Sequence, residues 1–291
     1  MHHIPVLLEE VIDFLNLKPE HIYVDCTVGH GGHSFEILKK LNGKCTLIGL
    51  DRDQSALEIA KERLKDFKNC YLFHANFTEL RDILNELKIN KITGGILLDL
   101  GVNSMQLDEP ERGFSFKNNA ALDMRMDKNQ KLTAQTIVNT YKEEDLANVI
   151  YKYGEERFSR RIARAIIQNR LKNGLIKGTL ELAKIISNCY PNRKYFKIHP
   201  ATRTFQALRI EVNKELENLE SFFCFIKELL SPNSRLIVIS FHSLEDRITK
   251  NFLKRNDAFK VLTKKPVIPS DIETEKNVRA RSAKLRAAER L

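Results

Sequence analysis

The sequence predicts an α/β fold: a Rossmann-like, doubly wound parallel sheet with an inserted, mainly helical second domain. Three observations support this prediction. In the first part of the chain, short apolar runs typical of buried strands alternate with amphipathic helical patterns. Three of those runs end at an acid, namely Asp25, Asp51 and Asp99. From Thr133 to about Tyr195 the pattern is purely helical, and a strand pattern returns only at Arg235.

Composition indicates an ordinary globular protein with an excess of positive charge. The 291 residues, 42% hydrophobic and 30% charged, suffice for one large α/β domain and a smaller one. No apolar run approaches the ~20 residues that a membrane span needs, and no signal-peptide pattern is present. We therefore expect a cytoplasmic protein with no membrane partner. The formal net charge of +10 favours a polyanionic partner.

The cysteine and histidine residues do not indicate a metal site. The five cysteines are odd in number, widely spaced and without a C-x-x-C pair, so neither disulfides nor bound zinc is predicted. We expect all five cysteines to be small buried hydrophobic residues. His30 and His33 lie on a glycine-rich loop without a nearby cysteine or acid partner for a metal, so cofactor contact is favoured over metal binding.

That glycine-rich loop follows the first predicted strand. The apolar run Ile22–Val24 stops at Asp25, and the next residues, Cys26–His33, include three glycines. Glycine lets the backbone adopt positive φ and lets a flat ligand lie against the amides, while the helix that begins near Phe35 points its N-terminus at the same place. The pattern is typical of a nucleotide site, with a merely tight strand-to-helix turn as the alternative.

The second strand, Cys45–Leu50, ends at Asp51. Asp51 follows Gly31 by 51 − 31 = 20 residues, the spacing at which an acid reaches ribose hydroxyls, so Asp51 is predicted to bind a ribose. Nicotinamide dinucleotides and S-adenosylmethionine both fit this pairing. Ser34 stands where the dinucleotide fingerprint requires a third glycine, and no second glycine-rich half follows, so S-adenosylmethionine is favoured.

Periodicity and capping signals predict the other elements of the first part. Helical spacing of apolar residues predicts a helix over 6–15 that packs over the cofactor region. The sequence Ser55–Glu58 is a capping box that begins a helix ending near Phe67. Phe77, directly after a strand, is predicted either to stack near an adenine or to belong to the core. The remaining predictions are a strand over 70–75, a helix over 78–87 and a strand over 95–100.

The polar residues 101–106 follow Asp99, so we expect them at the carboxyl edge of the sheet, where ligands of α/β folds bind. Their amide and hydroxyl groups are placed to meet both cofactor and substrate. Residues 108–127 show no clear period, and an unpatterned loop of this length is usually functional.

The inserted helical stretch contains a stripe of arginines. A capping box is predicted at Thr140–Glu143. Further on, arginines at helical spacing form one face and apolar residues another. Because arginines without an acid on the same stripe repel one another, a phosphate-binding surface is favoured over a merely solvated one. The stripe consists of Arg157, Arg160, Arg161 and Arg164.

Two further basic segments are candidates for binding RNA. Residues 199–209 begin a helix predicted to run toward Leu230, and Arg203 and Arg209 lie in its first turns among polar and aromatic residues. The terminal segment 275–291 holds six basic and two acidic side chains, a net charge of 6 − 2 = +4. Through Arg279 and Arg281 it is predicted to bind RNA phosphates, with a frayed basic terminus as an equal alternative.

Seven motifs together resemble the bacterial 16S ribosomal RNA cytosine-N4 methyltransferases of the RsmH (MraW) family, and the resemblance extends from residue 3 to residue 289. They occur in the family's order, and no single glycine loop accounts for the likeness. The motifs are Gly29–His33, Leu97–Gly101, Arg112–Phe116, Leu122–Asp127, Gly154–Phe158, His199–Phe205 and Ser240–Arg247.

The resemblance implies a methyltransferase that uses S-adenosylmethionine to methylate the N4 amine of a cytidine in the decoding centre of 16S rRNA, in the small ribosomal subunit. It implies cofactor contacts by Gly31, Gly32, His33, Asp51, Phe77, Asp99 and Gln106. For the reaction itself, groups that accept a hydrogen of the amine are required, and the candidates are Asp99, Asn103 and Ser104. A homodimer is left open.

The sequence departs from the family pattern at three positions. Asn103 stands where serine is usual, Met105 where proline is usual, and Val278 replaces a proline of the terminal motif. These changes affect loop geometry more than functional groups. The expected domains are 1–107 and 201–291 for the two parts of the methyltransferase domain, and 108–200 for the inserted helical domain that recognises the substrate.

Three alternatives to this function differ in class. The first is a methyltransferase that acts on DNA or a small molecule. The second is a nonenzymatic RNA-binding assembly factor with a vestigial cofactor pocket. A nicotinamide oxidoreductase is the most distant, because Ser34 and the missing second nucleotide site both argue against it.

Overall fold

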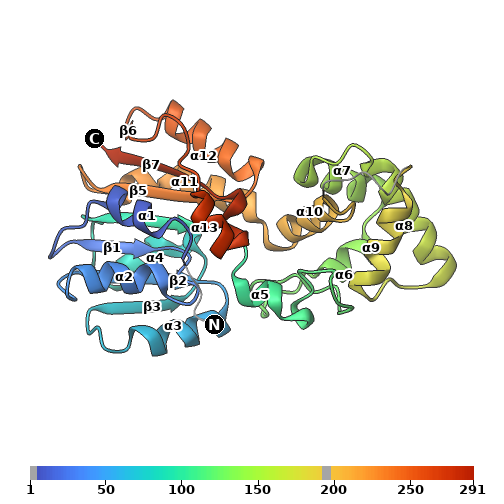
Figure 1. Cartoon of the computed structure of the whole chain (residues 1–291), viewed down its shortest axis with the longest axis horizontal. Coiled ribbons are helices and arrows are strands. Elements are labelled where there is room, and N and C mark those ends of the chain that lie inside the picture. The colour runs from blue at the N-terminus through green and yellow to red at the C-terminus, as the bar shows by residue number, and fades with distance from the viewer. Residues whose placement is uncertain (1–4, 192–197) are drawn as a thin grey trace. The chain divides into compact units, whose positions relative to one another are not determined.

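The computed structural model describes residues 5–191 and 198–291, apart from the side chain of Ser104, and divides into two units (Figure 1). Unit 1 comprises residues 1–101 and 216–291, and unit 2 comprises residues 102–215. The sequence placed the inserted domain at 108–200, so the observed insertion is longer at both ends. At its C-terminal end the added segment contains α10 (Thr202–Asn213), which packs against α7 (Glu143–Gly154) of unit 2.

Unit 1 is built on a seven-stranded sheet of order β3-β2-β1-β4-β5-β7-β6. Strands β1 to β5 are parallel, as the sequence predicted, while β7 runs antiparallel between β5 and β6. The sequence prediction missed β6 and β7. The strands are β1 (Ile22–Asp25), β2 (Thr46–Asp51), β3 (Cys70–His74), β4 (Gly95–Asp99), β5 (Arg235–Ser240), β6 (Phe259–Val261) and β7 (Lys284–Arg290).

Helices cover both faces of this sheet, as expected of a doubly wound fold (Figure 1). One face packs against α1 (Leu8–Leu15), α2 (Gly32–Lys40) and the end of α3 (Gln54–Leu64). The other packs against α4 (Leu80–Glu86), α11 (Glu215–Leu229) and α12 (Ser243–Arg255). The central strands β1, β2, β4 and β5 are mostly apolar because both of their faces are buried.

Unit 2 is mainly helical and has a hydrophobic core of its own. The stretch that lacked a sequence period contributes Phe114, Leu122, Met124 and Met126 to this core, so these four residues have a structural role. The buried Arg112 guanidinium donates hydrogen bonds to the carbonyl oxygens of residues 125 and 126. Besides α7 and α10, the helices are α5 (Ser104–Asp108), α6 (Ala134–Thr140), α8 (Ser159–Asn173) and α9 (Thr179–Asn188), with a 3-10 turn η2 (Pro110–Arg112).

Three predictions of helix ends were wrong. The N-cap of α3 is Asp53, whose carboxylate accepts a hydrogen bond from the Ser55 amide, so Ser55 itself is inside the helix. Helix α7 begins after Lys142 without a side-chain cap, so Thr140 caps nothing there. The long helix predicted toward Leu230 is interrupted at Lys214, which has a left-handed φ of 50° and separates α10 from α11. The predicted end of the helical stretch near Tyr195 lies outside the described residues.

The terminal segment is ordered, so the frayed alternative was wrong. It forms α13 (Asp271–Lys276), the 3-10 turn η4 (Val278–Ser282) and then β7 inside the sheet. Cysteine burial was only partly as predicted, because Cys224 is exposed and Cys70 half-buried. Among the described residues, no helix combines the length and apolar character needed to cross a membrane.

Candidate functional site

The glycine loop between β1 and α2 is held in a conformation that requires glycine. Gly29 and Gly31 have φ values of 51° and 75°, in the left-handed region, and Gly31 is the N-cap of α2. At Gly32 a Cβ atom would lie 2.5 Å from Cγ of Pro5, so the N-terminal segment packs directly on this glycine. This contact agrees with the predicted position of the N-terminal segment over the loop.

Asp51, at the end of β2, ties the glycine loop to its own loop. Its Oδ2 accepts a hydrogen bond of 2.7 Å from the Gly29 amide, and its Oδ1 accepts one of 2.8 Å from the Asp53 amide. Burial raises the pKa of Asp51 to about 6, although these amides act in the opposite direction. The Arg52 amide is a further backbone donor to this carboxylate. The carboxylate is therefore fixed in orientation, and of its roughly four acceptor sites one remains for a further donor.

Asp25 supports the same loop from inside, a role that the sequence did not reveal. This buried carboxylate accepts hydrogen bonds from the Ser34 hydroxyl at 2.7 Å and from the Thr27 amide at 3.2 Å. Burial raises its pKa to about 6. Ser34, whose presence argued against a dinucleotide site, thus binds the carboxylate that ends β1.

Asp99, at the end of β4, differs from the other two carboxylates in its bonding. Its Oδ1 is buried and has no hydrogen-bond partner among the described residues. Its Oδ2 lies 3.8 Å from Nδ1 of His33, and its backbone amide donates to the Thr27 hydroxyl at 2.7 Å. Burial, with the negative charges of Asp25 and Glu245 as smaller causes, raises the pKa of Asp99 well above its ordinary value.

His33 belongs to α2 and is 7% exposed. Its Nε2 lies 2.9 Å from the carbonyl oxygen of Val6. The glycine loop and the contacts between neighbouring strand ends thus link five predicted site residues of unit 1. These are Gly31, Gly32, His33, Asp51 and Asp99.

Phe77 lies in the core of unit 1. Its side chain is 8% exposed, and its ring packs edge-on against Phe222 with 5.5 Å between centroids. These contacts favour the core alternative that the sequence analysis left open.

Asn103, Ser104 and Gln106 begin unit 2 and form the start of α5. The Asn103 Oδ1 accepts from the Gln106 amide at 2.8 Å, and the Gln106 Oε1 accepts from the Asn103 amide at 3.1 Å. This reciprocal capping gives both residues a structural role beside any functional one. The chemistry of glutamine alone gave no reason to choose Gln106 as a cofactor contact. A glutamine at this position can cap a helix or bind a ligand, and the sequence does not distinguish the two roles.

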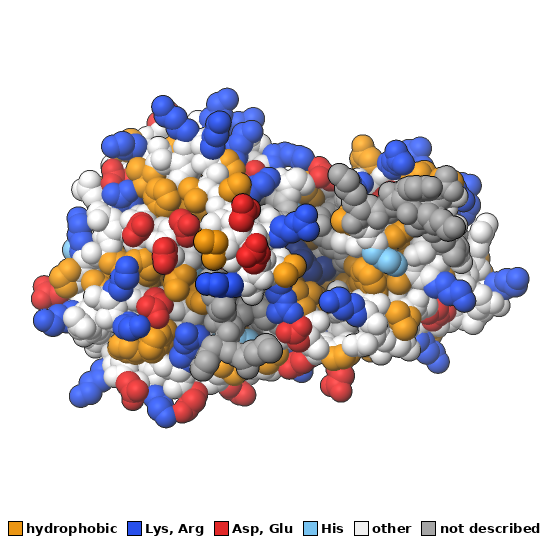
Figure 2. Space-filling model, in the orientation of Figure 1, with side chains coloured by type: hydrophobic (Ala, Val, Ile, Leu, Met, Phe, Trp, Pro, Cys, Tyr) orange, Lys and Arg blue, Asp and Glu red, His pale blue; other side chains and the backbone are white. Residues whose placement is uncertain are grey.

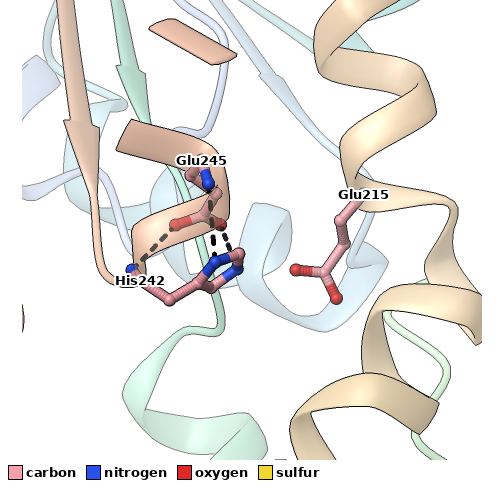
Figure 3. A group of neighbouring side chains, drawn as sticks. All are labelled: Glu215, His242 and Glu245. Carbon is pink, nitrogen blue, oxygen red and sulfur yellow. Dashed lines mark hydrogen bonds and ion pairs between the residues drawn. The ribbon is translucent and has the colours of Figure 1, made fainter. Parts of the chain in front are cut away.

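The motif that follows β5 forms a second capping box, at the start of α12 (Figure 3). Glu245 is buried and its Oε2 accepts from the Phe241 amide at 2.8 Å. The His242 ring lies beside the same carboxylate, with 3.2 Å between Nε2 and Oε1. Glu215 is also drawn in Figure 3, but it belongs to unit 2, where both of its carboxylate oxygens bind Arg209.

The arginine stripe in unit 2 lies on α8 as predicted, with one exception. Arg160, Arg161 and Arg164 are exposed residues of the helix, whereas Arg157 precedes it and packs over the Phe158 ring. Arg164 is 3.3 Å from the Glu143 carboxylate. Arg160 and Arg161 have no ion pair among the described residues.

The remaining RNA-binding candidates differ in accessibility. Arg203, Arg279 and Arg281 are exposed. Arg209 is not available, because its guanidinium makes two hydrogen bonds of 2.8 and 2.9 Å to Glu215 and is only 16% exposed. Its selection as an RNA contact was therefore wrong, because Glu215 occupies the guanidinium, a pairing that the helical pattern of this segment does not indicate. Figure 2 shows Lys and Arg side chains spread over the visible face with Asp and Glu side chains among them.

Comparison with known proteins identifies the family. A sequence model described as the MraW methylase family matches residues 1–291. The chain belongs to the MraW methylase family. A relative from Clostridium botulinum (strain Kyoto / Type A2), named ribosomal RNA small subunit methyltransferase H, is 49% identical over 99% of each chain. The protein of the same name from Sulfurihydrogenibium sp. (strain YO3AOP1) is 50% identical over 100% of each.

Solved structures add little to the family assignment. An rRNA methylase from Streptococcus thermophilus is 14% identical, with a TM-score of 0.43 over 100% of this chain and 99% of that one. A putative rRNA-methylase from Clostridium thermocellum is 12% identical, with a TM-score of 0.46 over 100% of both chains. These scores are low, so membership of the MraW family rests on sequence.

The donor and acceptor groups in unit 1 suit the cofactor predicted for this MraW methylase. S-adenosylmethionine offers ribose hydroxyls and an ammonium group as hydrogen-bond donors, and carboxylates accept such donors best. Asp51 can accept such a donor, because a carboxylate can accept about four hydrogen bonds. The buried Oδ1 of Asp99, which has no hydrogen-bond partner among the described residues, is a separate acceptor for a bound ligand. An unpartnered buried acceptor is costly unless a ligand satisfies it, so this atom is the clearest sign of a ligand site.

Proposed function

We propose that this MraW-family protein uses S-adenosylmethionine to methylate the N4 amine of a cytidine in the decoding centre of 16S rRNA, within the small ribosomal subunit. The coarser assignment, a methylase, follows from family membership. The rRNA substrate is supported by the names of the close relatives. The structural observation that supports the proposal most directly is the buried Oδ1 of Asp99, an acceptor at the carboxyl edge of the sheet that no donor of the described residues satisfies.

In this proposal the cofactor is held by backbone and carboxylate groups of unit 1. The amides of Gly31, Gly32 and His33 border its methionine portion, and Asp51 accepts hydrogens from the ribose hydroxyls. Phe77 and Gln106 are retained as contacts because the family resemblance implies them. The fixed orientation of Asp51 supports its role, since no reorganisation is needed when a ribose arrives.

The amine of cytosine is a poor nucleophile because its lone pair is delocalised into the ring. When bound, S-adenosylmethionine supplies a methyl carbon that bonds to the amine nitrogen while the carbon–sulfur bond breaks and its electron pair stays on sulfur. A protein group that accepts an amine hydrogen localises the nitrogen lone pair and so favours attack. Asp99, Asn103 and Ser104 are the proposed acceptors.

The target base must leave its stack to reach such a site, and the flanking RNA must be held meanwhile. We assign that role to exposed arginines of unit 2, above all Arg160 and Arg161, because no acid of the described chain neutralises them. Arg157, Arg164 and Arg203 also lie on the surface of this unit, and Arg279 and Arg281 offer a second basic site in unit 1.

Asn103 is tested by substitution with alanine. We expect Asn103→Ala to lower the methylation rate by roughly 10²-fold, the effect of removing one well-placed polar group, with cofactor affinity little changed. Because Asn103 also caps α5, the matched control is Thr133→Ala, which removes the N-cap of α6 in the same unit. Each loss should cost about 1 kcal/mol of stability. Unchanged turnover in Asn103→Ala would exclude Asn103 from the mechanism.

A further inference from the structure

The Val6 carbonyl fixes the position of one proton on His33. A carbonyl oxygen can only accept a hydrogen bond, so the ring nitrogen 2.9 Å from it, Nε2, must carry a proton. In the neutral imidazole the other nitrogen, Nδ1, then carries no proton and can only accept a hydrogen bond. The N-terminal segment that supplies Val6 is itself held in place, because Pro5 packs on Gly32 and the Leu7 amide donates to Glu273 at 2.8 Å.

Nδ1 of His33 faces Oδ2 of Asp99 at 3.8 Å. An imidazole nitrogen without a proton and an ionised carboxylate oxygen are both acceptors and would repel each other. The pair is therefore stable when it holds one further proton, either on Asp99 or on Nδ1 of His33. The titratable groups that face Asp99 are Asp25 from β1, His33 from α2 and Glu245 from α12. Burial, and then the charges of both acids, disfavour the ionised form of Asp99, so they favour this further proton on the carboxyl group of Asp99.

The two oxygens of Asp99 thus have different surroundings. Oδ2 faces His33, while Oδ1 is buried and without a partner among the described residues. An incoming amine would find a free acceptor at Oδ1, with a proton already held on the opposite side of the same carboxyl group.

We propose that Asp99 accepts the proton that the methylated amine must lose, and that His33 is a positioning residue that takes up the proton from Oδ2 as Oδ1 receives the new one. This inference rests on the proposed function. It identifies the proton acceptor in that reaction and gives a role to the His33 side chain that its place in a glycine loop does not imply.

The protons and charges balance in this scheme. After attack the amine nitrogen has one proton too many and a positive charge. That proton moves to Oδ1 of Asp99, the proton on Oδ2 moves to Nδ1 of His33, and the positive charge ends on the imidazolium. Asp99 stays neutral throughout. The distance of 3.8 Å must shorten by roughly 1 Å for the transfer, as commonly happens when catalytic groups close on a substrate.

Two substitutions of His33 distinguish the roles of its two ring nitrogens. In His33→Gln the side-chain amide can occupy the position of Nε2 and keep the bond to Val6, but nothing replaces Nδ1. In His33→Asn the amide can occupy the position of Nδ1, but it cannot take up a proton. We expect both variants to lose roughly 10²-fold in kcat with little change in KM for RNA. A wild-type rate in His33→Gln would show that His33 only packs against Val6, and would overturn the proposal.

The pH profile gives a second readout. In the wild-type protein the pair is competent when it holds one shared proton, so kcat should rise with pH as the doubly protonated pair loses a proton. In His33→Gln, Asp99 must be ionised to accept a proton, and its buried carboxyl has a raised pKa. The rising limb should therefore move to higher pH in this variant. An unmoved limb would contradict the proposal.

The decisive experiment needs neither cofactor nor substrate. Nitrogen-15 NMR of the cofactor-free protein should show His33 as the Nε2–H tautomer when neutral, and Asp99→Asn should shift its titration. A proton on Nδ1 with Nε2 bare, or a titration that Asp99→Asn leaves unchanged, would refute the pairing. If the pairing is observed but the wild-type protein methylates no RNA, the proposed function fails and the proton-acceptor role fails with it. If methylation occurs without the pairing, only this inference fails.

Discussion

At the scale of single residues, the carboxylates that end β1, β2 and β4 have the same sequence signature and three different environments. Asp25 binds Ser34 and the loop, and Asp51 accepts from backbone amides of two loops. Asp99 has one buried oxygen without a hydrogen-bond partner in the described part of the chain. The sequence could indicate which strands end at an acid, because an acidic residue directly after an apolar run is a local pattern. The sequence could not indicate which acid binds a ligand and which supports the loop, because the hydrogen bonds of each acid depend on groups from other parts of the fold.

Asp51 should make cofactor binding depend on pH. The ionised carboxylate accepts ribose hydroxyl hydrogens and the protonated form loses acceptor capacity, so affinity should be highest above the pKa of about 6 and fall as the pH is lowered through it. Asp51→Asn should weaken binding by roughly 10- to 100-fold at neutral pH and flatten this dependence. Calorimetric titration with S-adenosylmethionine measures both, with the exposed Asp66→Asn as control. Wild-type affinity in Asp51→Asn would exclude the ribose contact.

At the scale of elements, α8 was predicted well and β7 was not. In α8 the arginine face and the apolar face have a clear helical period, so their separation into exposed and buried residues could be read directly. In β7 the buried positions are filled by one leucine, two alanines and Arg286, whose charge is paired with Asp246 at 2.6 Å. Small and charged residues give no strand signal, and the partner of Arg286 is distant in sequence. The segment therefore resembled a basic tail.

The arginines of α8 are expected to act through phosphates. Replacing both Arg160 and Arg161 by alanine should weaken binding to small ribosomal subunits and reduce the slope of log affinity against log salt by about two. Filter binding over a range of salt concentrations measures this slope. The control is the double alanine variant of Lys172 and Lys177, exposed cations of unit 2 outside the stripe, which should leave the slope near that of the wild type. A slope unchanged by loss of Arg160 and Arg161 rejects their role.

At the scale of the whole molecule, the order of strands and helices was enough to predict an α/β sheet interrupted by a helical insertion, and the fold confirms this. The family resemblance was likewise confirmed across the whole chain. The limits of the insertion were harder to predict because α10 and α11 are separated only at Lys214, a residue with no glycine or proline signal. Each unit has its own hydrophobic core, and the tertiary contacts of a helix show to which unit it belongs. These contacts are not visible in the sequence.

The measurement that tests the proposed function most directly is methyl transfer from labelled S-adenosylmethionine to small ribosomal subunits that lack their native modifications, followed by mapping of the labelled nucleotide. The proposal predicts label on the N4 amine of a single cytidine in the decoding centre of 16S rRNA. Label on another base or another nucleic acid, or no transfer while the protein still binds the cofactor, would contradict it.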